Sequence, residues 1–278
     1  MKVYLLYLII CVFSIIKIGG NVEMIQQEPI TLQQIKNKYN LQVRKSYKNF
    51  FAATFFTPQH PEQLAIFKND TLVLSVKKQI LGHEWIPDKN ALVYLAADTI
   101  PLGGSSNPAK EIGVFYTDSL KHKKLMDLST KDNISGVRYA QFNNKVYVRC
   151  YHSNDGPKVF QLDIENKELI PTDYKHMNFS PKGKYYTNLT FGNPPIVLYE
   201  RASNTIKWQG DSSSDAGKMR FLRFFSWYLD AETTFLYLQN RYGVAKINCE
   251  MGEVVEFISK PERGMKPVLK SNGNIQWK

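Results

Sequence analysis

One unit of sequence recurs along the chain, and it constrains the fold more than any other feature. The unit opens with an aromatic residue, passes through two or three turn-forming residues and ends in a short strand of alternating apolar residues. Four copies begin at the aromatic residues Trp85, Tyr139, Phe179 and Trp227. Self-similarity at such a regular spacing is typical of folds in which one supersecondary unit stacks on the next.

A second unit follows each anchor and consists of a strand, a polar turn and a returning strand. Its copies span residues 114–128, 159–170, 196–208 and 244–258. The offset from anchor to second unit is nearly constant in the last three copies, from Tyr139 to Leu162, from Phe179 to Tyr199 and from Trp227 to Ile247. In the first copy the second unit lies further away, because the loop-like segment 98–110, with Gly103, Gly104 and Pro108, is inserted.

The composition and periodicity favour β structure. Aromatic residues make up 13% of the chain, and Tyr and Phe suit a pleated, half-buried surface. From about residue 46 short apolar runs alternate with turn signals. We expect the runs 92–95, 146–148, 185–189 and 235–238 to occupy equivalent places in successive sheets.

The segment before residue 46 differs from the rest. Thr31 and Gln34 form a capping-box pattern, and Leu32, Ile35 and Tyr39 follow at helical spacing. We therefore expect an N-terminal extension, residues 21–45, with one short helix that packs against the body, residues 46–278.

The first unit resembles the repeat of TolB-like and WD-like β-propellers, whose blades often carry an aromatic-Ser-Pro-Asp-Gly turn before a strand. Phe179-Ser180-Pro181-Lys182-Gly183 is the best match, followed by Trp85-Ile86-Pro87-Asp88. The resemblance implies an all-β fold, a small propeller of about five or six four-stranded blades. Residues 266–277 are then expected to be a partial blade. Lys182 stands where the motif has Asp, and residues 227–230 lack the Pro, which leaves the subfamily open.

A second, weaker resemblance is to the N-terminal propeller of dipeptidyl-peptidase-type serine peptidases, through Ile30-Thr31-Leu32-Gln33-Gln34-Ile35. Those enzymes carry their nucleophile in a separate α/β-hydrolase domain. This sequence contains no Gly-x-Ser-x-Gly elbow, so the resemblance implies no peptidase activity.

The N-terminal segment 1–20 predicts a signal peptide. Lys2 precedes an uncharged, mostly apolar run over residues 3–16, and Gly19 and Gly20 offer small residues for cleavage. We therefore expect a secreted or periplasmic protein. Two alternatives stay open, an uncleaved N-terminal anchor and a lipoprotein signal ending at Cys11.

Some classes of function are not supported, because the sequence lacks their motifs. It contains no Gly-rich phosphate loop between a strand and a helix, and no Cys/His spacing typical of a zinc site. After signal cleavage Cys150 and Cys249 would be the remaining cysteines, and a bridge between them stays open. We expect no catalytic residues, no metal and no cofactor.

The leading hypothesis is an exported, non-enzymatic binding or scaffold module, monomeric, whose partner is an unknown protein or an anionic surface polymer. Nucleic acid is not an expected partner, and membrane contact is expected only through an uncleaved N-terminal segment. The alternative is a small secreted, glycosidase-like hydrolase with two carboxylates at a central channel. Its candidate carboxylates lie near predicted turns: Asp88, Asp118, Asp163, Asp230 and Glu200.

The best candidate binding segment is residues 218–241, where arginines alternate with aromatic residues. The formal net charge of +11 makes an anionic partner a reasonable hypothesis. The binding residues predicted here are Arg220, Arg223, Trp227 and Arg241. The competing interpretation is an inner strand that packs its aromatic side chains between blades and carries arginines at its ends.

Overall fold

The computed structural model describes residues 30–39, 41–57, 60–97, 109–129, 134–152, 156–188, 196–210 and 222–278. The chain divides after Val137 into two compact units, which are described separately. The predicted signal peptide, the segment 98–108 and Arg220 lie outside the described residues.

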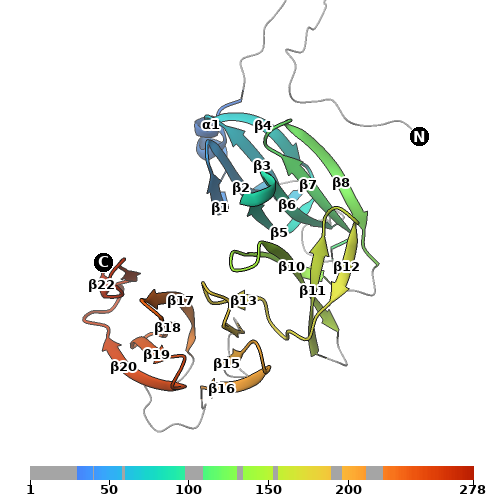
Figure 1. Cartoon of the computed structure of the whole chain (residues 1–278). Helices are drawn as coiled ribbons and strands as arrows, with labels where there is room; N and C mark the ends of the chain where they lie inside the picture. The colour runs from blue at the N-terminus through green and yellow to red at the C-terminus, as the bar shows by residue number, and fades with distance from the viewer. Residues whose placement is uncertain are drawn as a thin grey trace, which may run out of the picture. The chain divides into compact units, whose positions relative to one another are not determined.

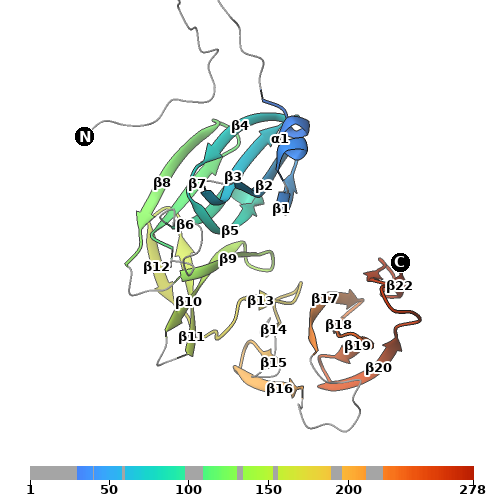
Figure 2. The same ribbon diagram turned by 180° about the vertical axis from the view of Figure 1, so that it is seen from behind.

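The first unit contains one helix and two four-stranded antiparallel sheets whose strands pair in chain order (Figures 1 and 2). The helix is α1 (Leu32–Lys38). Sheet I consists of β1 (Leu41–Tyr47), β2 (Phe50–Thr57), β3 (His60–Lys68) and β4 (Thr71–Val76). Sheet II consists of β5 (Gln79–Ile86), β6 (Ala91–Ala97), β7 (Glu111–Tyr116) and β8 (Lys121–Asp127), with the 3-10 turn Pro87–Lys89 between β5 and β6.

The second unit contains three more sheets of the same kind and a hairpin. Sheet III consists of β9 (Ile134–Ala140), which crosses the unit boundary, β10 (Lys145–His152), β11 (Gly156–Asp163) and β12 (Glu168–Pro171). Sheet IV consists of β13 (Asn178–Phe179), β14 (Tyr185–Thr187), β15 (Val197–Glu200) and β16 (Thr205–Gln209). Sheet V consists of β17 (Arg223–Asp230), β18 (Thr233–Gln239), β19 (Gly243–Asn248) and β20 (Glu253–Ser259), and the hairpin pairs β21 (Pro267–Leu269) with β22 (Ile275–Trp277).

This strand order confirms the expected fold class. Five separate four-stranded meanders, rather than one continuous sandwich sheet, are the blades of a β-propeller. The four runs expected to be equivalent lie on β6, β10, β14 and β18, the second strand of each of sheets II to V. The second sequence unit supplies the third and fourth strands of the same sheets. The expected partial blade is the β21–β22 hairpin.

The backbone repeats the same turn geometry in every sheet. The turn between the first and second strands always contains a residue with positive φ: Lys48, Asn90, Asn144, Gly183 and Ala231. The turn between the third and fourth strands does so as well, at Asn69, Leu120, Lys167, Asn204 and Gly252. Only Gly, and less readily Asn, adopts this conformation without steric cost. The fold therefore imposes the turn even where the residue type does not favour it.

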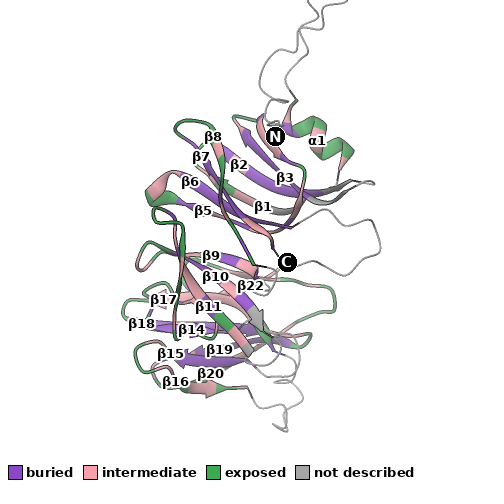
Figure 3. Cartoon of the chain, turned by 90° about the vertical axis from the view of Figure 1, so that its right-hand side faces the viewer, coloured by how far each residue is buried: buried purple, intermediate pink, exposed green. Residues whose placement is uncertain are grey.

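Burial follows the position of a strand within its sheet (Figure 3). The second and third strands carry most of the core, and all seven residues of β6 are buried. The fourth strands of sheets II to V carry most of the exposed strand residues, as in β20, where the first four residues are solvent-exposed, whereas β4 of sheet I has no exposed residue. The central strands are covered on both faces, so they read as continuous apolar runs instead of alternating ones.

The helix forms as its capping pattern predicts. The backbone N–H of Gln34 donates to Thr31 Oγ1 at 3.2 Å, and the backbone N–H of Thr31 donates to Gln34 Oε1 at 2.7 Å. Leu32 is buried with Phe55, Phe67 and Leu72 of sheet I. The predicted packing of the helix against the body is thereby confirmed. Sheet I begins at Leu41, inside the segment expected to be an extension.

Cys150 and Cys249 are both buried and form no disulfide with each other. Among the described residues no helix is long and apolar enough to cross a membrane.

Candidate functional site

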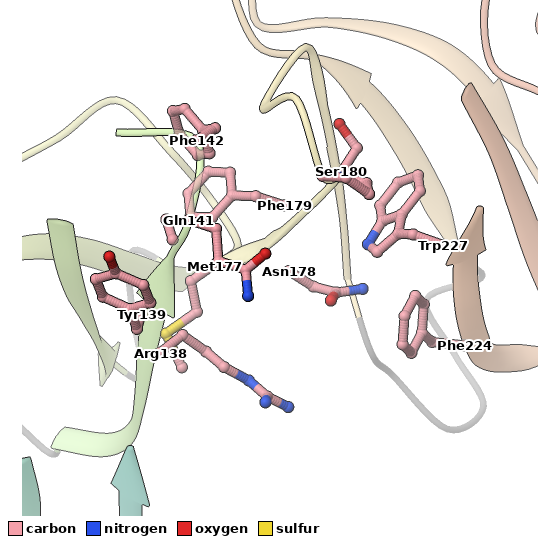
Figure 4. Close-up of a pocket in the computed structure, with 12 residues that line it drawn as sticks. Arg138, Tyr139, Gln141, Phe142, Met177, Asn178, Phe179, Ser180, Phe224 and Trp227 are labelled. Carbon is pink, nitrogen blue, oxygen red and sulfur yellow. The ribbon is translucent and has the colours of Figure 1, made fainter. Parts of the chain in front are cut away.

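Three of the four aromatic anchors of the sequence repeat line one pocket in the second unit. Tyr139 of β9, Phe179 of β13 and Trp227 of β17 all line it, each from the first strand of its sheet. The cavity has a volume of about 270 Å³ (Figure 4). Its other lining residues come from the same strands and the turns that flank them: Arg138, Ala140, Gln141, Phe142, Met177, Asn178, Ser180, Pro181 and Phe224.

The wall between β9 and β13 is held by the turn that the repeat motif predicts. The backbone N–H of Gly183 donates to the Ser180 carbonyl at 2.8 Å, and Ser180 Oγ accepts from the Tyr185 backbone N–H at 3.0 Å. Gly183 has a φ of 68°, and a Cβ there would lie 2.2 Å from Phe142 Cγ. The absent side chain lets Phe142 pack edge-on against Phe179, with ring centroids 5.3 Å apart. The aromatic wall of the pocket therefore depends on this turn.

The opposite wall depends on a β-bulge in β17. Phe224 pairs with Leu238, whereas Ser226 pairs with Tyr237, so Phe225 is an extra residue in the ladder. Side chains three positions apart in a regular strand lie on opposite faces. The extra residue instead brings Phe224 and Trp227 to one face, where their ring centroids are 6.1 Å apart.

Two buried hydrogen-bond donors face this pocket and have no partner among the described residues. They are Nδ2 of Asn178 and Nε1 of Trp227. In Figure 4 both nitrogens point into the space enclosed by β9, β13 and β17. Leaving such a donor buried and unpaired costs about 1–3 kcal/mol. An acceptor bound in the pocket would therefore satisfy both donors.

Other buried polar atoms, acceptors as well as donors, also lack a hydrogen bond in the described part of the chain. Buried side-chain atoms without a hydrogen bond occur at Gln79 and His83 on β5 and at Ser135 on β9. The remaining one in the described part of the chain belongs to Arg149 on β10, a residue that has other interactions. Five of the six buried side-chain atoms without a hydrogen bond in the described part of the chain therefore lie on first strands.

The one charged side chain among the lining residues is the guanidinium of Arg138, which also has an interaction of its own. None of the twelve lining residues is Asp or Glu. Beside the lining residue Met177, the pKa of His176 is lowered to about 4, because burial disfavours the charged ring and Arg149 and Lys175 lie nearby. The ring is thus neutral at physiological pH.

The structure brings one of the four predicted binding residues into the pocket. Trp227 lines it, whereas Arg220 lies outside the described residues. Arg223 is exposed at the start of β17 opposite Gln239, and Arg241 follows Gln239 in the next turn, with its guanidinium 4.6 Å from the Tyr242 ring centroid. Arg223 and Arg241 therefore lie at the same end of sheet V.

Sequence reasoning missed Arg138 and Asn178. Arg138 directly precedes the anchor Tyr139, and Asn178 directly precedes the anchor Phe179. Comparing the residue before each anchor would have drawn attention to both positions. Only the structure of the first strands shows that these two side chains line the pocket.

Three of the five candidate carboxylates of the glycosidase alternative accept hydrogen bonds within or between turns. Asp163 Oδ1 accepts from the backbone N–H groups of Glu165 and Asn166 at 2.9 and 3.0 Å. Glu200 accepts from Ser203 Oγ at 2.8 Å, and Asp118 from Asn90 Nδ2 at 3.1 Å. None of the five candidates lines the pocket. Among the residues described, no group of three or more His, Cys, Asp or Glu is placed to hold a metal ion.

Comparison with known proteins gives structural similarities only. No model of a known protein family matches the sequence, and no curated protein matches it. The structure is similar to TolB from Acinetobacter baumannii, with 18% identity and a TM-score of 0.49, over 82% of this chain and 57% of that one. It is also similar to a chain of the nidogen/laminin complex, with 10% identity and a TM-score of 0.45, over 76% of each chain.

The chain thus spans little more than half of the TolB structure. The fold assignment itself rests on the strand order of the five sheets, which agrees with the TolB-like propeller repeat seen in the sequence.

Proposed function

We propose that this protein is an exported β-propeller that acts as a binding module and not as an enzyme. The observation that carries the proposal is the pocket at β9, β13 and β17, where two buried donors have no partner in the described structure. An apolar cavity with a few convergent polar groups is the usual form of a ligand site.

The absence of acidic residues from the pocket lining argues against the glycosidase alternative. Glycoside hydrolysis requires two carboxyl groups that flank the scissile bond. The pocket offers aromatic faces and hydrogen-bond donors, which serve recognition, and its lining contributes no pair of carboxyl groups. A non-enzymatic role fits these residues better.

A second surface supports contact with an anionic polymer. Arg223 and Arg241 lie at one end of sheet V, and the chain as a whole is basic. Such contacts act through long-range attraction and weaken with salt. We regard this surface as secondary, because its arginines already have intramolecular contacts.

The proposal can be tested without knowing the ligand. Mixtures of small molecules and peptides are added to the full mature chain, labelled with ¹⁵N, and the indole N–H signal of Trp227 is followed by NMR. We expect binders to shift this signal, which Trp227→Phe identifies by removing it. Chromogenic aryl glycosides should not be hydrolysed above the buffer rate. Hydrolysis by the purified chain, or a complete screen that never shifts the Trp227 signal, would contradict the proposal.

A further inference from the structure

We propose that the pocket binds a small organic carboxylate whose charged group is attached to a flat apolar body. This inference rests on the proposed binding function and specifies its ligand. It combines the donors, the charge and the walls of the pocket, each of which restricts the ligand in a different way.

The donors require an acceptor. Asn178 presents an N–H of its side-chain amide, and the Trp227 indole N–H can only donate. A carboxylate has two oxygens that accept several hydrogen bonds, so one group can satisfy both donors. Hydrogen bonds to an ionised acceptor are also stronger than those between neutral groups.

The charged group of the lining favours an anionic ligand over a cationic one. Arg138 reaches toward the same space from β9 in Figure 4, and the lining residues bring no negative charge. A guanidinium at the rim attracts a carboxylate and can bind it in a fixed geometry. A cationic ligand would meet three groups that donate and no carboxylate to pair with.

The walls select a flat apolar body. Phe142, Phe179, Phe224 and Trp227 contribute ring surfaces from both sides of the cavity. A volume of about 270 Å³ is near the lower limit for ligand pockets, which fits a compact molecule. We therefore favour a small aryl carboxylate over the terminal carboxylate of a peptide.

Phenylacetate is a suitable probe, with phenylacetamide as its neutral counterpart of nearly the same shape. Binding is measured as the shift of the Trp227 indole signal during titration of the full mature chain. We expect phenylacetate to bind at least tenfold more tightly than phenylacetamide. Arg138→Gln and Asn178→Leu should each weaken phenylacetate at least tenfold while affecting phenylacetamide much less. A peptide with a C-terminal Phe, tested free and amidated, forms the second arm.

Matched controls separate binding from folding. Arg263→Gln removes an exposed arginine outside the pocket and should leave the affinity unchanged. For Trp227→Phe, followed by the Asn178 amide signal, the control is Trp208→Phe, since Trp208 packs in the core of sheets IV and V. Equal binding of the acid and the amide, or an Arg138→Gln variant with wild-type affinity, would overturn the carboxylate assignment.

The outcomes distinguish this inference from the function on which it rests. Tighter binding of the free peptide than of phenylacetate would replace the small molecule by a peptide terminus. Failure of every acid, together with pocket binding of a neutral molecule, would refute the ligand class and leave the binding function intact. Failure of all ligands in the pocket would refute both.

Discussion

At the scale of single residues, close packing fixes positions that composition does not reveal. Gly113 of β7 faces Tyr94 of β6, and a Cβ on Gly113 would lie 2.1 Å from Tyr94 Cζ. The Tyr94 ring is buried, stacks on His122 at 5.7 Å and hydrogen-bonds to its Nε2. This ring cannot retreat without breaking contacts on its far side.

Gly113→Ala should therefore destabilise the fold by about 1–3 kcal/mol, the usual cost of overpacking a core. Gly82→Ala is the matched control, because its Cβ would make only an ordinary 3.6 Å contact with Val137. Both variants are compared by urea denaturation. Equal stability of Gly113→Ala and the wild type would show that the ring can move.

At the scale of elements, the sequence repeat was recognised in sheets II to V and not in sheet I, although the expected number of blades, about five or six, agrees with the structure. The first strand of each of sheets II to V carries an aromatic anchor, and in sheet II the turn Pro87–Lys89 follows it. In sheet I the turn after β1 is Lys48-Asn49, without Pro or Gly, and Lys48 takes a φ of 51°. Neither Lys48 nor Asn49 is a residue type that marks this turn in the way that Pro or Gly would. The aromatic wall of the pocket was visible in the repeat, whereas the unpaired donors depend on tertiary geometry.

The helix offers a direct test at this scale. Thr31→Ala removes the oxygen that accepts from Gln34 N–H and should lower the free energy of unfolding by about 1 kcal/mol. Thr31→Ser keeps the oxygen and should restore most of the loss. The readout is again urea denaturation, with the far-ultraviolet helix signal as a second measure. If the Ser variant were destabilised as much as the Ala variant, the lost methyl group and not the lost hydrogen bond would explain the effect.

At the scale of the whole molecule, the topology keeps strand pairing local in the sequence. Every strand of a sheet pairs with its neighbour in sequence, so each sheet is built from local hairpins. Local contacts favour rapid folding. Cys150 and Cys249 lie in the core and form no disulfide with each other, so the described fold does not depend on a bridge between them.

The expected signal peptide leads to a prediction about the N-terminus of the mature chain. If the segment 1–20 is a signal peptide, the mature chain should begin near Asn21. Intact-mass measurement and N-terminal sequencing of the exported protein test this. A chain that retains Lys2 would indicate an uncleaved anchor, and an N-terminal lipidated Cys11 a lipoprotein.

Because of the bulge at Phe225, the pocket depends on the number of residues in β17 as well as on which residues they are. Deleting Phe225 would restore the two-residue alternation of β17 and turn Phe224 away from the face that Trp227 occupies. A related protein could therefore match every lining side chain in an alignment and still lack the cavity. Gaps in the alignment at this position, more than substitutions, will distinguish relatives that share the site from those that share only the fold.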